Sequence, residues 1–279
     1  MLSKNNSFAD KKDITSIAIG GFDGMHTAHQ TLFSNLSRKG AIIVIDSGYA
    51  NLTPLHNREE YSSFPIFYYA LENIKALSGQ EFVNLLVQEF PLLNKIVVGF
   101  DFHFGKNRSC GTKELKHFFE GEVIVLNEIS VNNIAIHTRV IREYLKNADI
   151  KNANILLGRS YKIRGLHIKG QGLGKTDFFP TINIEVKDYL LPKDGVYISK
   201  TIVDEQVYDS VTFLGHRHST DGEYAVETHI LNKNILIKNE NIEIKFCKYI
   251  RGNQKFDSFE ALKNQIQMDI KNTKEYFHN

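Results

Sequence analysis

Residues 17–33 read IAIGGFDGMHTAHQTLF and decide the fold of the first half of the chain. An apolar run ends at Gly20 and Gly21, and an amphipathic run begins near His26. Glycines in a turn between a buried strand and a helix let backbone amides approach a phosphate closely, and the helix N-terminus adds partial positive charge. The stretch therefore predicts an α/β domain with a nucleotide-phosphate site at its first strand-to-helix turn.

The segments that follow this turn alternate between strand-like and helix-like patterns. Short, nearly continuous β-branched runs predict parallel strands within 14–22, 41–46, 94–100 and 122–129. Helical spacing predicts helices within 29–40, 59–77, 79–90 and 112–120. Residues 1–157 are therefore expected to form a doubly wound, Rossmann-like α/β domain that binds a nucleotide.

The pattern changes after Gly158. Strand-like runs are then separated by Gly, Asn and Asp turns, and no helical crossover lies between them. Such strands pair antiparallel and are expected to close into a barrel. Residues 256–277 place Phe259, Leu262, Ile266 and Ile270 on one face of a final helix. Residues 158–279 are therefore expected to form an antiparallel β-barrel domain with a terminal helix.

Composition narrows the class of partner. The chain has 34 basic and 32 acidic residues and a formal charge of +2, so neither nucleic acid nor an anionic membrane surface is expected as a partner. Cys110 and Cys247 lie far apart and have no metal-type spacing. The N-terminal segment is polar, and no apolar run approaches the roughly 20 residues that span a bilayer. We expect a soluble cytoplasmic protein, and the sequence leaves its oligomeric state open.

His26 and His29 form the first candidate catalytic pair. Residues at i and i+3 lie on one helical face, where both imidazoles can reach one phosphate. There they would stabilise the charge that develops on an α-phosphate during nucleotidyl transfer. Histidines at this spacing also occur as packing residues, but the glycine turn directly before them favours the phosphate site. A zinc pair would need i, i+4 spacing with an intervening Glu, which is absent.

Two further clusters in the first half have side chains that suit a polyphosphate. Asp101 follows a predicted strand, so it is expected at the carboxyl edge of the sheet, where open α/β folds bind ligands. Lys106 and Arg108 add donors, although a basic surface loop would look the same. Thr138 and Arg142 open a predicted helix, where a hydroxyl and a guanidinium suit phosphate oxygens and where Thr138 would also serve as a simple helix cap.

A second phosphate site is predicted in the other half of the chain. Its glycine-rich loop, able to wrap phosphates, consists of Gly170, Gly172, Gly174 and Lys175. Thr181 and Asn183 follow it and, two apart on a strand, face the same side. Their hydroxyl and carbonyl are hard oxygen ligands suited to Mg²⁺ bound to ATP. A plain glycine turn followed by ordinary polar strand residues is the alternative.

The motifs of the first half resemble the adenylyltransferase half of the bacterial bifunctional riboflavin kinase/FAD synthetase family. They are residues 21–29, residues 99–105 with Arg108, and Thr138 with Arg142. Ala28 stands where the family has glycine, and residues 43–54 replace the family's Phe-Asp-Pro-His-Pro stretch. The resemblance implies that His26 and His29 are catalytic and that ATP is bound by Gly21, Phe22, Gly24, Asp101, Arg108, Thr138 and Arg142.

The second half is similar to the riboflavin kinase domain of the same family. The matching residues are Phe178–Asn183, Gly195–Tyr197 and Val226–His229, with Phe178 in place of a glycine. The resemblance implies that Glu227 is the base that takes the proton from the ribityl 5′-hydroxyl as it attacks the γ-phosphate of ATP. It also implies that Thr181 and Asn183 hold the magnesium ion and that the glycine-rich loop binds ATP.

Together, the two resemblances imply one activity for each half of the chain. Residues 158–279 would phosphorylate riboflavin to FMN, and residues 1–157 would adenylylate FMN to FAD. The substrates would be riboflavin, FMN and ATP, with Mg²⁺ required in both steps. Two other functions stay open from the sequence: a riboflavin kinase with a non-catalytic adenylyltransferase domain, and a flavin-sensing binding protein.

Overall fold

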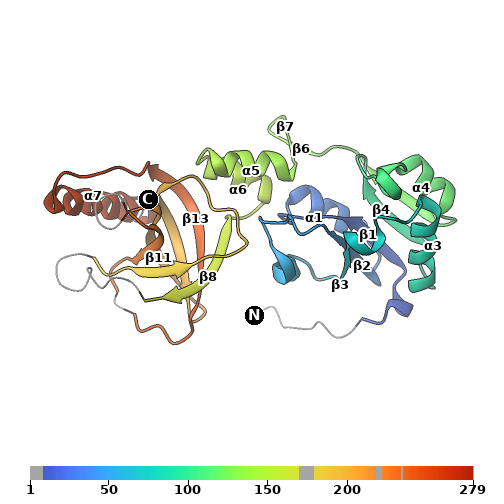
Figure 1. Ribbon diagram of the computed structural model, residues 1–279, viewed down its shortest axis with the longest axis horizontal. Helices are drawn as coiled ribbons and strands as arrows, with labels where there is room; N and C mark the ends of the chain where they lie inside the picture. The colour runs from blue at the N-terminus through green and yellow to red at the C-terminus, as the bar shows by residue number, and fades with distance from the viewer. Residues whose placement is uncertain (1–8, 170–178, 218–221, 234, 279) are drawn as a thin grey trace. The chain divides into compact units, whose positions relative to one another are not determined.

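The computed structural model describes residues 9–169, 179–217, 222–233 and 235–278. The chain divides into two compact units, Met1–Thr138 and Arg139–Asn279 (Figure 1). Along the described ranges, no helix is both long enough and apolar enough to cross a membrane.

The first unit is built on one five-stranded parallel sheet of order β3-β2-β1-β4-β5. Its strands are β1 (Ser16–Gly20), β2 (Gly40–Asp46), β3 (Ile66–Ala70), β4 (Lys95–Gly99) and β5 (Glu122–Leu126). The helices of this unit are α1 (Thr27–Phe33), α2 (Leu71–Ile74), α3 (Gly79–Glu89) and α4 (Thr112–Phe118). Short 3-10 helices span Lys11–Asp13, Leu55–Tyr61 and Lys106–Arg108, and β6 (Ser130–Val131) pairs with β7 (Ile134–Ala135).

Apolar layers cover both faces of this sheet, which explains the continuous hydrophobicity of its strands. Ile17 and Ile19 of β1 belong to one buried cluster, together with Phe82 and Leu86 of α3. Ala18, between them, belongs to the cluster on the other face with residues of α1. Successive strand residues point to opposite faces, so a strand covered on both sides has no polar alternation. The predicted doubly wound α/β fold is confirmed.

The helix predicted over residues 59–77 was wrong. This stretch contains the end of a 3-10 helix, strand β3 (Ile66–Ala70) and the single-turn helix α2 (Leu71–Ile74). β3 is the edge strand of the sheet, and its residues are half-buried or exposed, so it lacks the apolar run that marks the central strands. Pro65, directly before it, and the aromatic sequence IFYYA were the signals that favoured a strand.

The second unit contains a closed six-stranded antiparallel barrel of order β10-β11-β12-β9-β8-β13. Its strands are β8 (Lys162–Ile168), β9 (Ile182–Glu185), β10 (Gly195–Val203), β11 (Gln206–His216), β12 (Tyr224–Ile230) and β13 (Asn241–Arg251). Helices α5 (Thr138–Lys146) and α6 (Ile150–Leu157) precede the barrel, and α7 (Phe259–His278) follows it. The predicted barrel and terminal helix are confirmed.

The compact units divide earlier than the boundary expected after residue 157. Helix α6 packs on the barrel strand β13, because the Asn154 side chain donates to the carbonyl of Phe246 at 3.0 Å and accepts the Tyr161 amide at 2.7 Å. Leu145 of α5 likewise accepts a hydrogen bond from the Lys193 amide. These contacts join both helices to the second unit, and they link residues too distant in sequence for a pattern to reveal.

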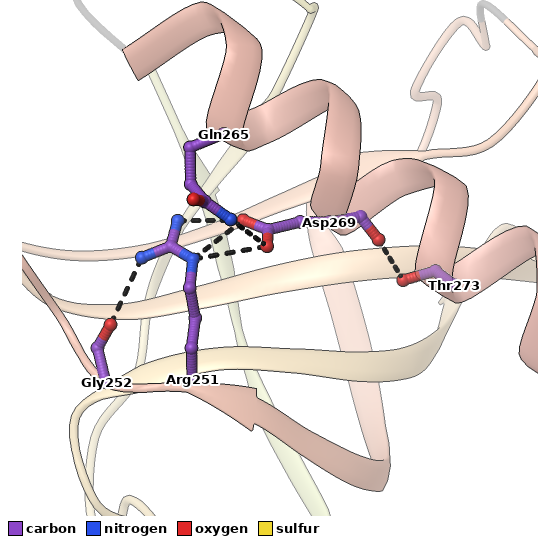
Figure 2. A network of polar contacts seen from close by, with 5 residues as sticks. All are labelled: Arg251, Gly252, Gln265, Asp269 and Thr273. Atoms are coloured by element: carbon purple, nitrogen blue, oxygen red, sulfur yellow. Dashed lines mark hydrogen bonds and ion pairs between the residues drawn. The ribbon is translucent and has the colours of Figure 1, made fainter. Parts of the chain in front are cut away.

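Figure 2 shows how α7 is held on the barrel. The buried carboxylate of Asp269 in α7 accepts hydrogen bonds from Nε and Nη2 of Arg251, the last residue of β13. Gln265 donates to the same carboxylate, and Ile270 packs on buried residues of the barrel. The ion pair and the apolar contact fix one face of α7 to the strands.

The barrel interior includes a cluster of buried hydroxyl groups. Every hydroxyl in it has at least one hydroxyl partner, at distances of 2.7–3.1 Å. Because buried hydroxyls without partners are costly, this network favours a single register of β10, β11 and β12. The members are Ser199, Thr201, Ser210, Thr212 and Thr228.

Candidate functional site

The topology of the first sheet places two candidate loops at its switch point. From β1 the chain proceeds through β2 to β3 on one side, and then returns to β4 and β5 on the other. Loops at the carboxyl ends of β1 and β4 therefore meet where open α/β sheets bind ligands. The loop after β1 contains residues 21–26, and the loop after β4 contains Asp101.

The loop after β1 adopts an unusual backbone conformation. Phe22, Gly24 and Met25 have φ values of 47°, 89° and 43°, in the left-handed region. Two of these are not glycine, so the turn stores strain of the kind that surrounding contacts must hold in place. Phe22 is buried and packs edge-on against Phe33 and His29. The turn is thus fastened to α1 by an aromatic side chain.

Asp23 joins this turn to the loop after β2. Its carboxylate accepts hydrogen bonds from the backbone amides of Asn51, Leu52 and Thr53, at 2.9–3.3 Å. The Gly24 amide donates to the hydroxyl of Thr53 at 2.8 Å. Gly24 therefore donates its amide within the protein. No role was predicted for Asp23 from the sequence, because the contact that shapes the turn joins residues far apart in the chain.

His26 and His29 come together as predicted. Their rings stack with centroids 3.5 Å apart, and His26 is 3% exposed. His26 is also the N-cap of α1, because its Nδ1 accepts the His29 amide at 3.3 Å. A neutral imidazole that accepts at Nδ1 has its proton on Nε2, the nitrogen able to donate to a phosphate oxygen. The packing role and the phosphate role considered from the sequence are compatible in this geometry.

The other predicted residues of this site differ in placement. Thr138 lies at the turn, since its hydroxyl donates to the carbonyl of Asp23 at 2.9 Å. Arg142 lies one helical turn later in α5, within the second unit. Asp101 and Arg108 are exposed on the loop after β4, and among the described residues no hydrogen bond or ion pair joins either one to the histidines. Gly21 is exposed, and a Cβ there would meet the backbone oxygen of Ile45 at 4.0 Å, an ordinary contact distance.

In the second unit, sheet pairing brings two candidate residues face to face. Asn183 of β9 is the direct partner of Glu227 in β12. Thr181 precedes β9 and is exposed, two residues before Asn183 and therefore on the same face. Directly paired residues of antiparallel strands have their Cβ atoms about 4.5–5.5 Å apart. A hydroxyl, an amide carbonyl and a carboxylate thus converge on one patch of the barrel.

Arg217 is a charged residue of this patch that was not predicted from the sequence. Its Nη1 donates to Oε1 of Glu227 at 3.0 Å. Arg217 directly follows β11, ten residues before Glu227, and lies outside every motif of the resemblance. An arginine beside a turn has no distinguishing sequence signal, so only the fold reveals the pair.

A groove between β12 and α7 adjoins the same patch. Its two hollows share Leu231, Asn232, Lys233 and Lys274; one extends to Phe179 and His229, and the other to Tyr208 and Phe277. The Nδ1 atom of His229 lies 2.8 Å from the carbonyl of Pro180, next to Thr181. Burial lowers the pKa of His229 below its ordinary value of 6.5. Aromatic rings and two lysines line a space beside the predicted metal ligands.

The predicted glycine-rich loop lies outside the described residues. Gly170, Gly172, Gly174 and Lys175 all fall within 170–178. Strand β8 before this loop pairs with β9 after it, with Ile168 opposite Asn183. The strands on either side of residues 170–178 therefore pair next to the patch.

Comparisons with known proteins cover both units. A family model described as riboflavin kinase matches residues 157–277. A bifunctional riboflavin kinase/FMN adenylyltransferase of Buchnera aphidicola is 31% identical, over 96% of this chain and 96% of that protein. Relatives of the same name from Listeria monocytogenes and Bacillus subtilis are 30% and 27% identical, over 95% and 94% of this chain and 93% and 92% of their own lengths.

A solved structure matches the chain over nearly its whole length. It is a crystal structure described as a macrolide-efflux protein from Streptococcus pneumoniae, with a TM-score of 0.81 and 26% identity. The match covers 95% of this chain and 97% of that one. The arrangement of an α/β unit followed by a barrel is therefore shared with an experimentally determined structure.

Proposed function

Because the chain belongs to the bifunctional riboflavin kinase/FMN adenylyltransferase family, we propose that it makes FMN from riboflavin and then FAD from FMN, with ATP as the donor in both steps. The pairing of Asn183 with Glu227 is the observation that carries this proposal, since it places a proton acceptor beside an oxygen ligand, on the strand that pairs with β8.

The kinase step uses the patch on the barrel. The riboflavin 5′-hydroxyl gives its proton to the Glu227 carboxylate as its oxygen attacks the γ-phosphorus of ATP. The bond from that phosphorus to its bridging oxygen breaks, FMN forms and ADP leaves. Phosphoryl transfer depends mainly on positioning and on neutralising charge, so an acceptor held opposite Asn183 is in a suitable place. The groove with Phe179, Asn232 and Lys274 suits the adenine ring and phosphates of ATP.

Magnesium is the ion that this donor set fits. Thr181 and Asn183 offer neutral side-chain oxygens, which suit a hard cation that also keeps substrate phosphates and water as ligands. When bound, Mg²⁺ would neutralise phosphate charge. Thr181 and Asn183 would hold it, leaving Glu227 for the proton.

The cytoplasmic location stays a prediction from the sequence.

The adenylyl step uses the turn of the first unit. A phosphate oxygen of FMN attacks the α-phosphorus of ATP, the bond between that phosphorus and the oxygen bridging to the β-phosphorus breaks, and pyrophosphate leaves. His26 donates from Nε2 to the α-phosphate oxygens, and the stacked His29 supports it. Thr138 and Arg142, at the start of α5, bind the triphosphate, with Asp101 and Arg108 on the loop after β4.

A chromatographic time course that resolves FMN from FAD tests both halves of the proposal. Starting from riboflavin, ATP and Mg²⁺, the wild-type protein is expected to form FMN first and FAD afterwards. The double variant His26→Ala/His29→Ala is expected to stop at FMN, whereas Glu227→Gln is expected to form almost no FMN yet still convert added FMN to FAD. His56→Ala, an exposed histidine of the first unit, is the matched control and should behave as wild type. Equal loss of both activities in either variant, with FMN formation assayed from riboflavin and FAD formation assayed from added FMN, would refute the assignment of one reaction to each unit.

A further inference from the structure

The carboxylate of Glu227 is held by a specific arginine. Nη1 of Arg217 donates to Oε1 of Glu227 at 3.0 Å, and each side chain is only 20% exposed. Water screens such a pair less than one on the open surface. A guanidinium is planar and its donors have fixed directions, so it restrains the orientation of a carboxylate more strongly than an ammonium does.

The backbone around Arg217 is fixed on both sides. Its amide donates to the carbonyl of Glu223 at 2.9 Å, and its carbonyl accepts from the amide of Gly222 at 3.1 Å. Arg217 directly follows β11, and β11 pairs with β12 from His216 opposite Tyr224 through to Phe213 opposite Glu227. The guanidinium therefore projects from the end of β11 onto a residue of the neighbouring strand β12.

We infer that Arg217 is a positioning residue for the kinase reaction, which orients the carboxylate of Glu227 toward the hydroxyl that it deprotonates. The inference rests on the proposed function. A carboxylate has about four acceptor positions, so the contact from Arg217 restrains the Oε1 atom and uses one of them. Asn183, directly opposite, borders the carboxylate on the β9 side, and Phe213 borders it on the β11 side.

The pair contributes to orientation more than to folding. Partly exposed ion pairs add little to stability, because the attraction is offset by lost side-chain freedom. By contrast, a small misplacement of a reacting group lowers the rate of chemistry by up to about 100-fold. Loss of Arg217 should therefore appear in kcat for FMN formation while the KM values and the unfolding temperature stay nearly unchanged.

Arg217→Ala and Arg217→Lys test the inference in the full-length protein. We expect Arg217→Ala to lower kcat for FMN formation by about 10- to 100-fold, with KM for ATP and riboflavin within about twofold of wild type. Arg217→Lys keeps the charge without the planar fork and should recover only part of the loss. Arg164→Ala is the matched control, because Arg164 of β8 pairs with Glu243 of β13 in another arginine–glutamate pair of the barrel. It should retain wild-type kcat.

Chemical rescue separates positioning from folding. Millimolar guanidinium should raise kcat of Arg217→Ala several-fold and leave Arg164→Ala unchanged, even if Arg217→Ala also lowers the unfolding temperature. The inference is wrong if Arg217→Ala keeps wild-type kcat, if its loss lies entirely in KM, or if guanidinium gives no rescue. A wild-type protein that forms no FMN would instead overturn the proposed function, so the two failures are distinguishable.

Discussion

Replacing Asp23 with asparagine should open the loop after β2 and impair only the adenylyl step. The carboxylate accepts the amides of Asn51, Leu52 and Thr53, and Asp23 is 9% exposed. The amide oxygen of asparagine can still accept two of these bonds, but its NH₂ group then faces the third N–H. Hydrogen bonds to a charged group are worth about 1.5–3 kcal/mol each. One lost bond and two weakened ones should cost about 2–3 kcal/mol locally.

Amide hydrogen exchange measures this cost where it arises. Since each 1.36 kcal/mol is tenfold, protection of the amides of residues 51–53 should fall about 30- to 150-fold. FAD formation from FMN should drop as well, because the same residue fixes the turn that ends at His26 and accepts the hydroxyl of Thr138. FMN formation from riboflavin should stay at the wild-type rate.

Asp46→Asn, at the end of β2, is the matched control. Asp46 accepts the exposed amide of Gly48, at 3.0 Å, and an asparagine oxygen can accept that bond equally well. Exchange and FAD formation should be unchanged in this variant. If protection of residues 51–53 in Asp23→Asn stays within threefold of wild type, the carboxylate does not hold the two loops together and the reasoning is refuted.

Three further substitutions test the barrel unit, with unfolding followed by far-UV circular dichroism because the chain has no Trp. Asp269→Asn leaves the partly buried Arg251 without its charge partner, so it should lower the unfolding free energy of the unit by about 3–5 kcal/mol. A loss of unfolding free energy below about 1 kcal/mol would contradict the ion pair shown in Figure 2. Burial alone would raise the pKa of Glu243, but ion pairs with Lys162 and a neighbouring arginine hold that pKa below its ordinary value of 4.5. Wild type should therefore be more stable than Glu243→Gln. This difference in unfolding free energy should be full above about pH 5 and disappear as the pH falls through the lowered pKa. Ser199→Ala removes a hydroxyl from the buried network and should cost about 1–3 kcal/mol, and an unchanged midpoint would show that the network tolerates a gap.

Local sequence patterns predicted most of the fold, because most of its strands, turns and helices are determined by residues close together in the sequence. The strand, glycine turn and helix around residues 17–33 were predictable, since each depends on neighbours in sequence. Strand β3 was missed because an edge strand is only partly buried and loses its period. The division of compact units after Thr138 depends on how α5 and α6 pack against the barrel, which no window of sequence contains.

The candidate sites show the same limit. His26 and His29 were found from their spacing, because one turn of helix brings them together. Glu227 had no distinguishing pattern of its own and was identified only through the resemblance; the register of β9 and β12 explains why that residue lies beside Asn183. Arg217 and Asp23 make their contacts with residues ten or more positions away in the sequence. Both contacts could therefore be identified only from the folded structure.

The backbone of the first turn also bears on Ala28, which stands where the family has glycine. Ala28 is the second residue of α1, and its φ does not lie in the left-handed region, so a methyl group there causes no backbone strain. The left-handed residues are Phe22, Gly24 and Met25, all before the helix. The backbone conformation of the turn that would face a phosphate is thus determined before the helix, by the burial of Phe22 and the hydrogen bonds of Asp23. This conformation does not require glycine at position 28. The alanine at position 28 therefore gives no backbone reason to regard the adenylyl site as vestigial.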